Sequence, residues 1–288
     1  MVPDRLAAWP VFGRDAPDVA WRPGPGDLAD TRLARFLRST GHADLTELQR
    51  HAEADPGWFW GAAAGDLAIP WQRRPRATLD LADGPEFARW WTGGAFNYAA
   101  AAVEPRAGRA PDGPALAWEG DDGEVRRLTN LELQEAVERA AAMLQARGVR
   151  AGDRVGILLP LLPETVVAVL ALGLIEAIYT PIFSGYGAPA VAARLRDAEA
   201  SVLITADGFL RRGAVVRLKE TADAAVADVP SVRQVLVVRR LGARGGSVPW
   251  TPGRDAWWHE ALADAPVRRQ GPATVTDPET PYMLIYTS

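Results

Sequence analysis

The sequence contains no cysteine, and lysine is almost as scarce. A disulfide framework, a thiol nucleophile and a metal centre with cysteine ligands are therefore excluded. The basic residues are nearly all arginine, and Lys219 is the only lysine. Transfer of phosphoryl or adenylyl groups needs cations on the phosphates, commonly a loop lysine together with magnesium. Lys219 lies within a predicted helix, so we do not expect it to fill that position.

Signals for several other classes of protein are also absent. The three histidines follow no metal-ligand spacing, and no G-x-G-x-x-G motif follows a predicted strand, which disfavours a dinucleotide-binding dehydrogenase. The most apolar stretch, residues 155–183, contains Glu164 and Glu176 and so has no charge-free span of bilayer length. A formal net charge of −4 gives no broad positive field for nucleic acid or an anionic membrane. We therefore expect a cytoplasmic protein whose partners are small molecules, with neither nucleic acid nor membrane among them.

The first hundred residues are rich in proline and large aromatic side chains. Helical patterns run over residues 31–37 and 45–54, and either Asp44 or Thr46 can cap the second one. Residues 58–60 then bring two tryptophans and a phenylalanine together. Side chains of this size gain so much from burial that we expect an ordered, helical or irregular extension rather than a disordered tail.

A run of glycine, proline and aspartate from Ala107 to Pro114 marks a boundary. We place an N-terminal extension at residues 1–110 and the main domain at residues 111–288. A hairpin follows the boundary, because alternating apolar residues flank a turn at residues 120–123. Thr129 and the glutamate three residues later then form a capping box that opens a helix.

Beyond Gly152 apolar strands alternate with helices. The predicted strands are residues 154–159, 177–183, 202–206, 234–238 and 282–286, and the predicted helices open at Pro163 or cover residues 188–197 and 215–226. Strands that are apolar throughout belong in a sheet buried on both faces. The fold class is therefore α/β, with a mostly parallel, doubly wound sheet preceded by the aromatic-rich extension.

Ligands of open parallel sheets bind at the carboxyl ends of the strands, so the loops there are the first candidates for a site. Residues 183–187 read FSGYG, and this loop can approach a ligand closely before a helix begins. Residues 207–213 place Arg211 and Arg212 near a predicted helix start, where planar guanidinium groups suit phosphate. Glycine pairs and arginine doublets are also common structural features, so neither loop by itself identifies a ligand.

Residues 152–242 as a string resemble the AMP-forming acetyl-CoA synthetases, within the wider class of adenylate-forming acyl-CoA ligases. The resemblance is carried by GDRVGILLPLLPETVVAVLAL, AIYTPIFSGYGAPAVAARLRDAEASVLITADGFLRRG and PSVRQVLVVRRLG. The flanking phrases ARWWTGGAFN, WEGDDGEVRRLT, VPWTPGRDAWWHEAL and DPETPYMLIYTS agree with it. It covers the chain from about residue 30 to the end, in the family's order and spacing.

The resemblance implies a coenzyme A site on two loops. The matching residues are Phe183, Ser184, Gly185, Arg211, Arg212, Gly213 and Ala214. Arg211 is then expected to pair with the 3′-phosphate of coenzyme A. Ser184 replaces a common glycine, and Ala214 stands where the family has a second arginine, so the pairing can shift to Arg212.

The resemblance also implies that the sequence stops where an ATP phosphate loop begins, at Thr287 and Ser288. The family's carboxylate pocket, adenine site, magnesium ligand and C-terminal lysine would all lie beyond this point, so no catalytic residue and no metal ligand is predicted within residues 1–288. We expect the N-terminal portion of an enzyme that uses ATP, Mg²⁺ and coenzyme A to activate acetate, or another short carboxylate, and expect these 288 residues alone to be inactive.

Two alternatives remain open from the sequence. The chain can be a non-catalytic coenzyme A-binding or scaffold protein derived from the same family. It can also be an unrelated doubly wound nucleotide-binding protein, although the number of matched phrases disfavours this. Nothing in the sequence indicates the oligomeric state.

Overall fold

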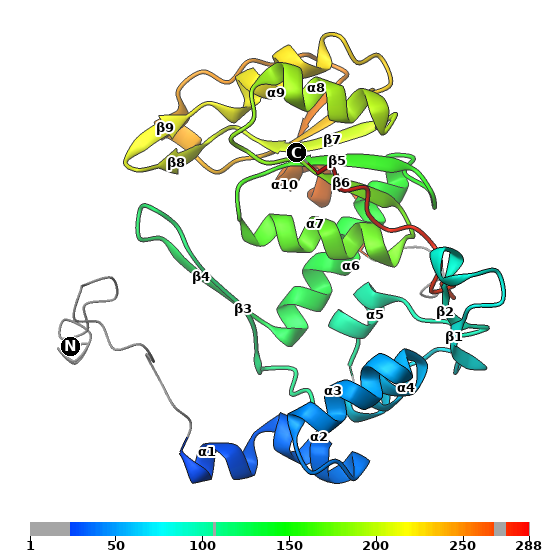
Figure 1. Cartoon of the computed structure of the whole chain (residues 1–288). Helices are drawn as coiled ribbons and strands as arrows, with labels where there is room; N and C mark the ends of the chain where they lie inside the picture. The colour runs from blue at the N-terminus through cyan, green and yellow to red at the C-terminus, as the bar shows by residue number, and fades with distance from the viewer. Residues whose placement is uncertain (1–23, 106–107, 268–274, 288) are drawn as a thin grey trace, which may run out of the picture. The chain divides into compact units, whose positions relative to one another are not determined.

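The computed structural model describes residues 24–105, 108–267 and 275–287. The chain divides into two compact units, Met1–Ile69 and Pro70–Ser288, which are described separately below (Figure 1). The division at residue 110 that the sequence suggested stays a prediction.

The first unit is helical. Its helices are α1 (Pro25–Asp30), α2 (Arg32–Thr40), α3 (Leu45–Ala54) and α4 (Pro56–Asp66). Asp44, rather than Thr46, caps α3, because its carboxylate accepts a hydrogen bond of 2.9 Å from the backbone N–H of Glu47. Phe36 of α2 is buried and meets Phe59 of α4 edge to face at 6.2 Å. The predicted helix at residues 45–54 is confirmed, and the aromatic cluster after it is helical as well.

The second unit begins with two hairpins and a short helix. Strands β1 (Ala77–Asp80) and β2 (Arg89–Thr92) pair antiparallel around the short 3₁₀ turn η1 (Pro85–Phe87), and α5 (Tyr98–Val103) packs on the helices of the main domain. Strands β3 (Pro114–Glu119) and β4 (Val125–Thr129) form the hairpin predicted after the boundary. The capping box at Thr129 is confirmed, and it opens α6 (Asn130–Ala146).

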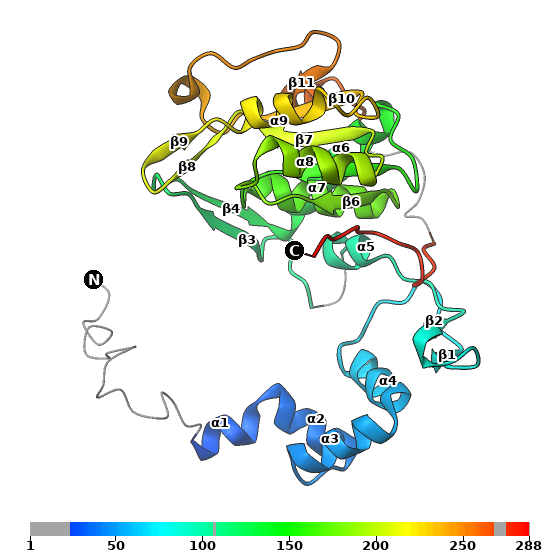
Figure 2. The same ribbon diagram turned by 45° about the horizontal axis from the view of Figure 1, so that its top comes forward.

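A five-stranded parallel sheet forms the centre of the second unit, in the order β11-β10-β7-β5-β6. Its strands are β5 (Arg154–Leu158), β6 (Ile178–Pro181), β7 (Val202–Ala206), β10 (Gln234–Val238) and β11 (Asp255–Trp257). The connecting helices are α7 (Pro163–Leu174), α8 (Ala188–Asp197), α9 (Leu218–Val226) and α10 (Trp258–Ala263). Helices α8 and α9 pack together on one face of the sheet, and α6 and α7 on the other (Figures 1 and 2). The predicted doubly wound α/β fold is confirmed.

Two sequence-based assignments were wrong. The predicted strand at residues 282–286 forms only one isolated parallel bridge, between Met283 and Tyr179 of β6. The predicted helix at residues 215–226 begins instead at Leu218, because residues 214–216 form β9 (Ala214–Val216), which pairs with β8 (Phe209–Arg211). Val215 and Val216 are β-branched and favour this pairing over a first helical turn.

The only lysine is fully buried in the second unit, within a network of charges. Lys219 Nζ donates hydrogen bonds to Asp223 Oδ1 at 2.7 Å, to Asp255 Oδ2 at 2.8 Å and to the carbonyl oxygen of Pro249 at 3.0 Å. Arg254 bonds both carboxylates as well. Burial raises the pKa of Asp255, but the hydrogen bonds from Arg254 and Lys219 outweigh this and lower it below its ordinary value. The expectation that Lys219 sits within a helix is confirmed.

Candidate ligand-binding crevice

The winding of the sheet places a crevice between β5 and β7. From β5 the chain passes through α7 to β6 on one side, whereas from β7 it passes through α9 to β10 on the other side. At such a reversal the loops leaving two adjacent strands turn apart and open a gap at their carboxyl ends. Pockets of open α/β sheets form there, so the geometry alone directs attention to this edge.

A cavity of about 510 Å³ occupies this edge. It is lined by the segments that follow β5, β6, β7 and β10 and by the β3–β4 hairpin. The lining includes Trp118, Leu161, Phe183, Ser184, Arg211 and Arg240. Its volume is in the range of small-molecule sites. Two loops that were singled out from the sequence, at residues 183–187 and 207–213, therefore meet at one cavity.

The loop after β6 contributes an exposed aromatic ring. Phe183 has 59% of its surface exposed and packs edge to face on Tyr186 at 5.5 Å. A turn holds the two together, because the N–H of Tyr186 donates to the carbonyl oxygen of Phe183 at 3.0 Å. A Cβ at Gly185 would approach the Phe183 ring to 2.5 Å, so the glycine lets the ring adopt this position. Ser184 lines the cavity beside Phe183.

Arg211 lies at the tip of the β8–β9 hairpin, not at a helix start as the sequence suggested. The turn residues Arg212 and Gly213 both have positive φ, 52° and 77°, which is the geometry of a tight two-residue hairpin turn. Ala214 pairs with Arg211 across the hairpin. The backbone N–H of Arg212 donates to Asp121 Oδ2 at 3.3 Å, which ties this hairpin to the β3–β4 turn.

Arg211 carries a charge that the surrounding protein leaves unneutralised. Its side chain is exposed and lines the cavity, and within the described segments it forms no ion pair or hydrogen bond. An unpaired guanidinium and an exposed aromatic ring that line one cavity suit a ligand that has both an anionic group and a planar ring. Of the predicted site residues, Phe183, Ser184 and Arg211 line the cavity. The other four lie in the same two loops: Gly185 follows Ser184, and Arg212, Gly213 and Ala214 belong to the β8–β9 hairpin.

Another part of the cavity lining, around Trp118 and Arg240, was missed by the sequence reasoning. Trp118 of β3 donates its indole N–H to the carbonyl oxygen of Leu161 at 2.7 Å, and the Arg240 guanidinium lies 5.1 Å from the centre of its ring. Asp122 accepts hydrogen bonds of 2.6 Å from both Arg240 and Arg244, which lower the pKa of its carboxyl well below the usual range. In the sequence Arg240 stands in one of several arginine doublets; the only signal that could have drawn attention to this one is that it follows the parallel strand β10.

Neither a membrane span nor a metal centre is found in residues 24–105, 108–267 and 275–287. None of the helices there is long and apolar enough to cross a bilayer. Histidine and carboxylate side chains do not gather there in a group of three that could hold a metal ion. Thr287 is exposed and lies outside the lining of the crevice, and Ser288 falls outside the described residues.

Comparison with known proteins points to one family. Residues 103–288 match the sequence model of a family described as AMP-binding enzyme, and residues 45–102 match one described as acetyl-coenzyme A synthetase N-terminus. The acetyl-coenzyme A synthetase of Mycolicibacterium smegmatis is 44% identical over 245 residues, which are 84% of this chain and 25% of the relative. That of Streptomyces avermitilis is 42% identical over 262 residues, which are 90% of this chain and 39% of the relative.

A solved structure agrees with this relationship. The acetoacetyl-CoA synthetase from Streptomyces lividans superposes with a TM-score of 0.75 at 29% sequence identity, over 89% of this chain and 40% of that protein. The chain thus spans between a quarter and two fifths of the length of these three proteins.

Proposed function

The chain belongs to the family of AMP-binding enzymes, and from this we propose that it is the N-terminal portion of a longer acyl-CoA synthetase. In this proposal the whole protein activates acetate, or another short carboxylate, with ATP and Mg²⁺ and transfers the acyl group to coenzyme A. The names of the similar proteins and the limited share of their length that the chain spans support it.

The crevice between β5 and β7 is the proposed coenzyme A site of this chain. One observation carries the assignment: Arg211, unpaired among its described neighbours, and the exposed ring of Phe183 line the same cavity at the carboxyl ends of the strands. Coenzyme A offers a purine ring and a 3′-phosphate, which match an aromatic ring and a guanidinium. Arg212 is the second candidate for the phosphate, since it is exposed on the same hairpin.

Residues 1–288 by themselves are expected to release no pyrophosphate from ATP in the presence of acetate and Mg²⁺. Adenylyl transfer needs cations on the triphosphate, and the only lysine is buried and bonded to two carboxylates. The measurement is a coupled pyrophosphate assay on the purified 288-residue chain with and without acetate. Acetate-dependent release above the blank would contradict the expectation; coenzyme A binding by the same inactive sample would show that it is folded, and would favour a binding role for this part.

The 3′-phosphate preference tests the role of Arg211. We expect the chain to bind coenzyme A about 10- to 100-fold more tightly than 3′-dephospho-coenzyme A, since a hydrogen bond to a charged group contributes about 1.5–3 kcal/mol. The Arg211→Ala variant should lose most of this preference and keep its affinity for the dephospho form. Isothermal titration calorimetry measures both constants.

Two further variants complete this test. Arg233→Ala removes an exposed arginine at the amino end of β10, away from the crevice, and should keep the preference. Arg212→Asn removes the neighbouring charge with a residue that tolerates a positive φ. Loss of the preference in Arg212→Asn but not in Arg211→Ala would move the phosphate contact to Arg212. An unchanged preference in both variants would refute the site.

A further inference from the structure

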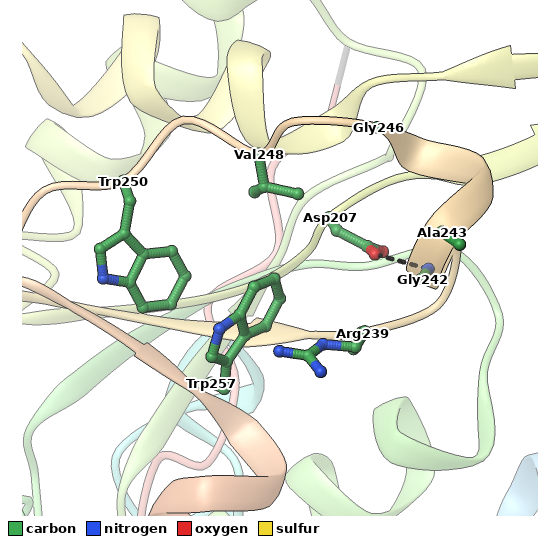
Figure 3. Close-up of a pocket in the computed structure, with 8 residues that line it drawn as sticks. All are labelled: Asp207, Arg239, Gly242, Ala243, Gly246, Val248, Trp250 and Trp257. Atoms are coloured by element: carbon green, nitrogen blue, oxygen red, sulfur yellow. Dashed lines mark hydrogen bonds between the residues drawn. The ribbon is translucent and has the colours of Figure 1, made fainter.

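A second cavity, of about 580 Å³, opens at the carboxyl ends of β7, β10 and β11, outside the proposed coenzyme A site (Figure 3). Its lining includes Asp207, Arg239, Gly242, Val248, Trp250 and Trp257. Arg239 lines this cavity and Arg240 lines the crevice; consecutive side chains point to opposite sides of an extended chain, so the two cavities are separate.

Arg239 supplies a fixed positive charge to this cavity. Its guanidinium carbon lies 4.3 Å from the centre of the Trp257 ring, so the planar group rests on the indole. Arg240, the next residue, bonds Asp122 and Glu124, whereas Arg239 is exposed and pairs with no carboxylate in the part of the chain that the structure describes. The N–H groups of Arg239 are therefore available to an oxyanion.

The carboxylate in the lining does not compete for Arg239. Asp207 is buried and accepts hydrogen bonds of 2.8–3.2 Å from the backbone N–H groups of Gly208, Arg240, Leu241 and Gly242. Figure 3 shows the bond to Gly242, with the Asp207 carboxylate directed at the loop. These hydrogen bonds hold the loop that forms the rim of the cavity, and they satisfy the carboxylate oxygens of Asp207 without Arg239.

Two tryptophans give the cavity a rigid aromatic wall. Trp250 and Trp257 stack with their ring centres 4.8 Å apart and their planes at 29°, and Trp250 still has 38% of its surface exposed. Lys219 Nζ lies 5.9 Å from the centre of the Trp250 ring and bonds the carbonyl oxygen of Pro249. The buried charge network therefore fixes the wall before any ligand arrives, and this reduces the ordering that binding requires.

We propose that this cavity binds a planar aromatic acid, with its ring against Val248 and Trp250 and its carboxylate or phosphate on the guanidinium of Arg239. The cavity volume is in the range of small-molecule sites. The site lies outside the crevice and does not depend on coenzyme A binding there. The proposed class of ligand follows from the unpaired guanidinium of Arg239, which lies next to the stacked rings of Trp250 and Trp257.

The test uses benzoate and phenyl phosphate as probes, with benzamide as the neutral analogue of benzoate. In NMR titrations of the ¹⁵N-labelled 288-residue chain, both acids should shift the indole N–H signals of Trp250 and Trp257. Benzoate should bind about 10-fold more tightly than benzamide. In Arg239→Gln this ratio should fall to about one, whereas in Arg233→Gln, the same charge change at the other end of β10, it should persist.

Several outcomes would overturn the site. No binding of either acid at millimolar concentration, a benzoate preference that survives Arg239→Gln, or an equal loss in Arg233→Gln would each refute it. Shifts at the indole of Trp118 instead would place the probes in the crevice. If both acids bind as expected, their relative affinities decide whether the natural ligand is a carboxylate or a phosphate ester. Arg211→Ala should leave this binding unchanged, which separates the site from the coenzyme A proposal.

Discussion

Replacing Lys219 with methionine is expected to lower the free energy of unfolding by about 3–5 kcal/mol, because it leaves a buried carboxylate without one of its cations. The side chains of Lys219 and Asp255 are 1% and 0% exposed, so water cannot take over the lost bonds. For a unit of this size the change corresponds to a fall in Tm of roughly 6–20 °C. Urea unfolding followed by circular dichroism gives the free energy.

An exposed ion pair provides the matched control. Arg154 and Glu199 pair at 3.0 Å with side chains that are 33% and 78% exposed, so Glu199→Gln should cost less than about 1 kcal/mol. A cost that small for Lys219→Met would contradict the buried network.

Acid titration adds a second readout of the same variant. The pKa of Asp255 is lowered in the folded protein, so its stabilising contribution is present above its unfolded pKa, about 3.9, and is lost as the pH falls through the folded value. Without Lys219 that loss should begin at higher pH.

Replacing Gly208 with alanine is expected to destabilise the second unit by about 3 kcal/mol and to weaken coenzyme A binding in the crevice. A Cβ at this position would collide with the backbone carbonyl oxygen of Val216 and would approach Leu241 Cδ1 to 2.5 Å. Backbone cannot move aside as a flexible side chain can, so the β8–β9 hairpin that carries Arg211 has to shift. Thermal unfolding and calorimetric titration with coenzyme A measure the two effects.

The control for this substitution is another glycine at the same edge of the sheet. A Cβ at Gly187 would meet only Pro189 Cδ, at 3.9 Å, and its φ of −75° is allowed for alanine. Gly187 is the N-cap residue of α8, where alanine is less favourable than glycine, so Gly187→Ala should cost no more than about 1 kcal/mol. Equal effects of the two substitutions would show that the close approach at Gly208 does not matter.

The local elements of the fold could be predicted where adjacent residues decide them. The β3–β4 hairpin, the capping box at Thr129 and the helix at residues 188–197 all depend on contacts a few residues apart. The helix expected from Val215 failed because its first residues pair with residues 209–211. The strand expected at residues 282–286 was wrong, because this segment forms only one bridge to β6. How many pairing partners an apolar segment finds depends on the tertiary structure.

The candidate site was predictable only in part for the same reason. The sequence indicated the loops at residues 183–187 and 207–213, since both follow apolar strands of a parallel sheet. Trp118 and Arg240 are 122 residues apart in the sequence and share no motif, yet the fold places both in the lining of the crevice. Arg239 and Arg240 form a doublet like several others in the sequence, and only their surroundings give them different roles.

The sequence by itself determined the fold class, the family and the absence of any cysteine chemistry, because these depend on residue types and their order along the chain. The tertiary structure alone decided which charges are free. Lys219 and Arg240 are bonded to carboxylates, whereas Arg211 and Arg239 are left exposed in the linings of two cavities. Whether a cation can bind a ligand depends on the anions that surround it and on its exposure to water. Segments distant in the sequence determine both the neighbouring anions and the exposure.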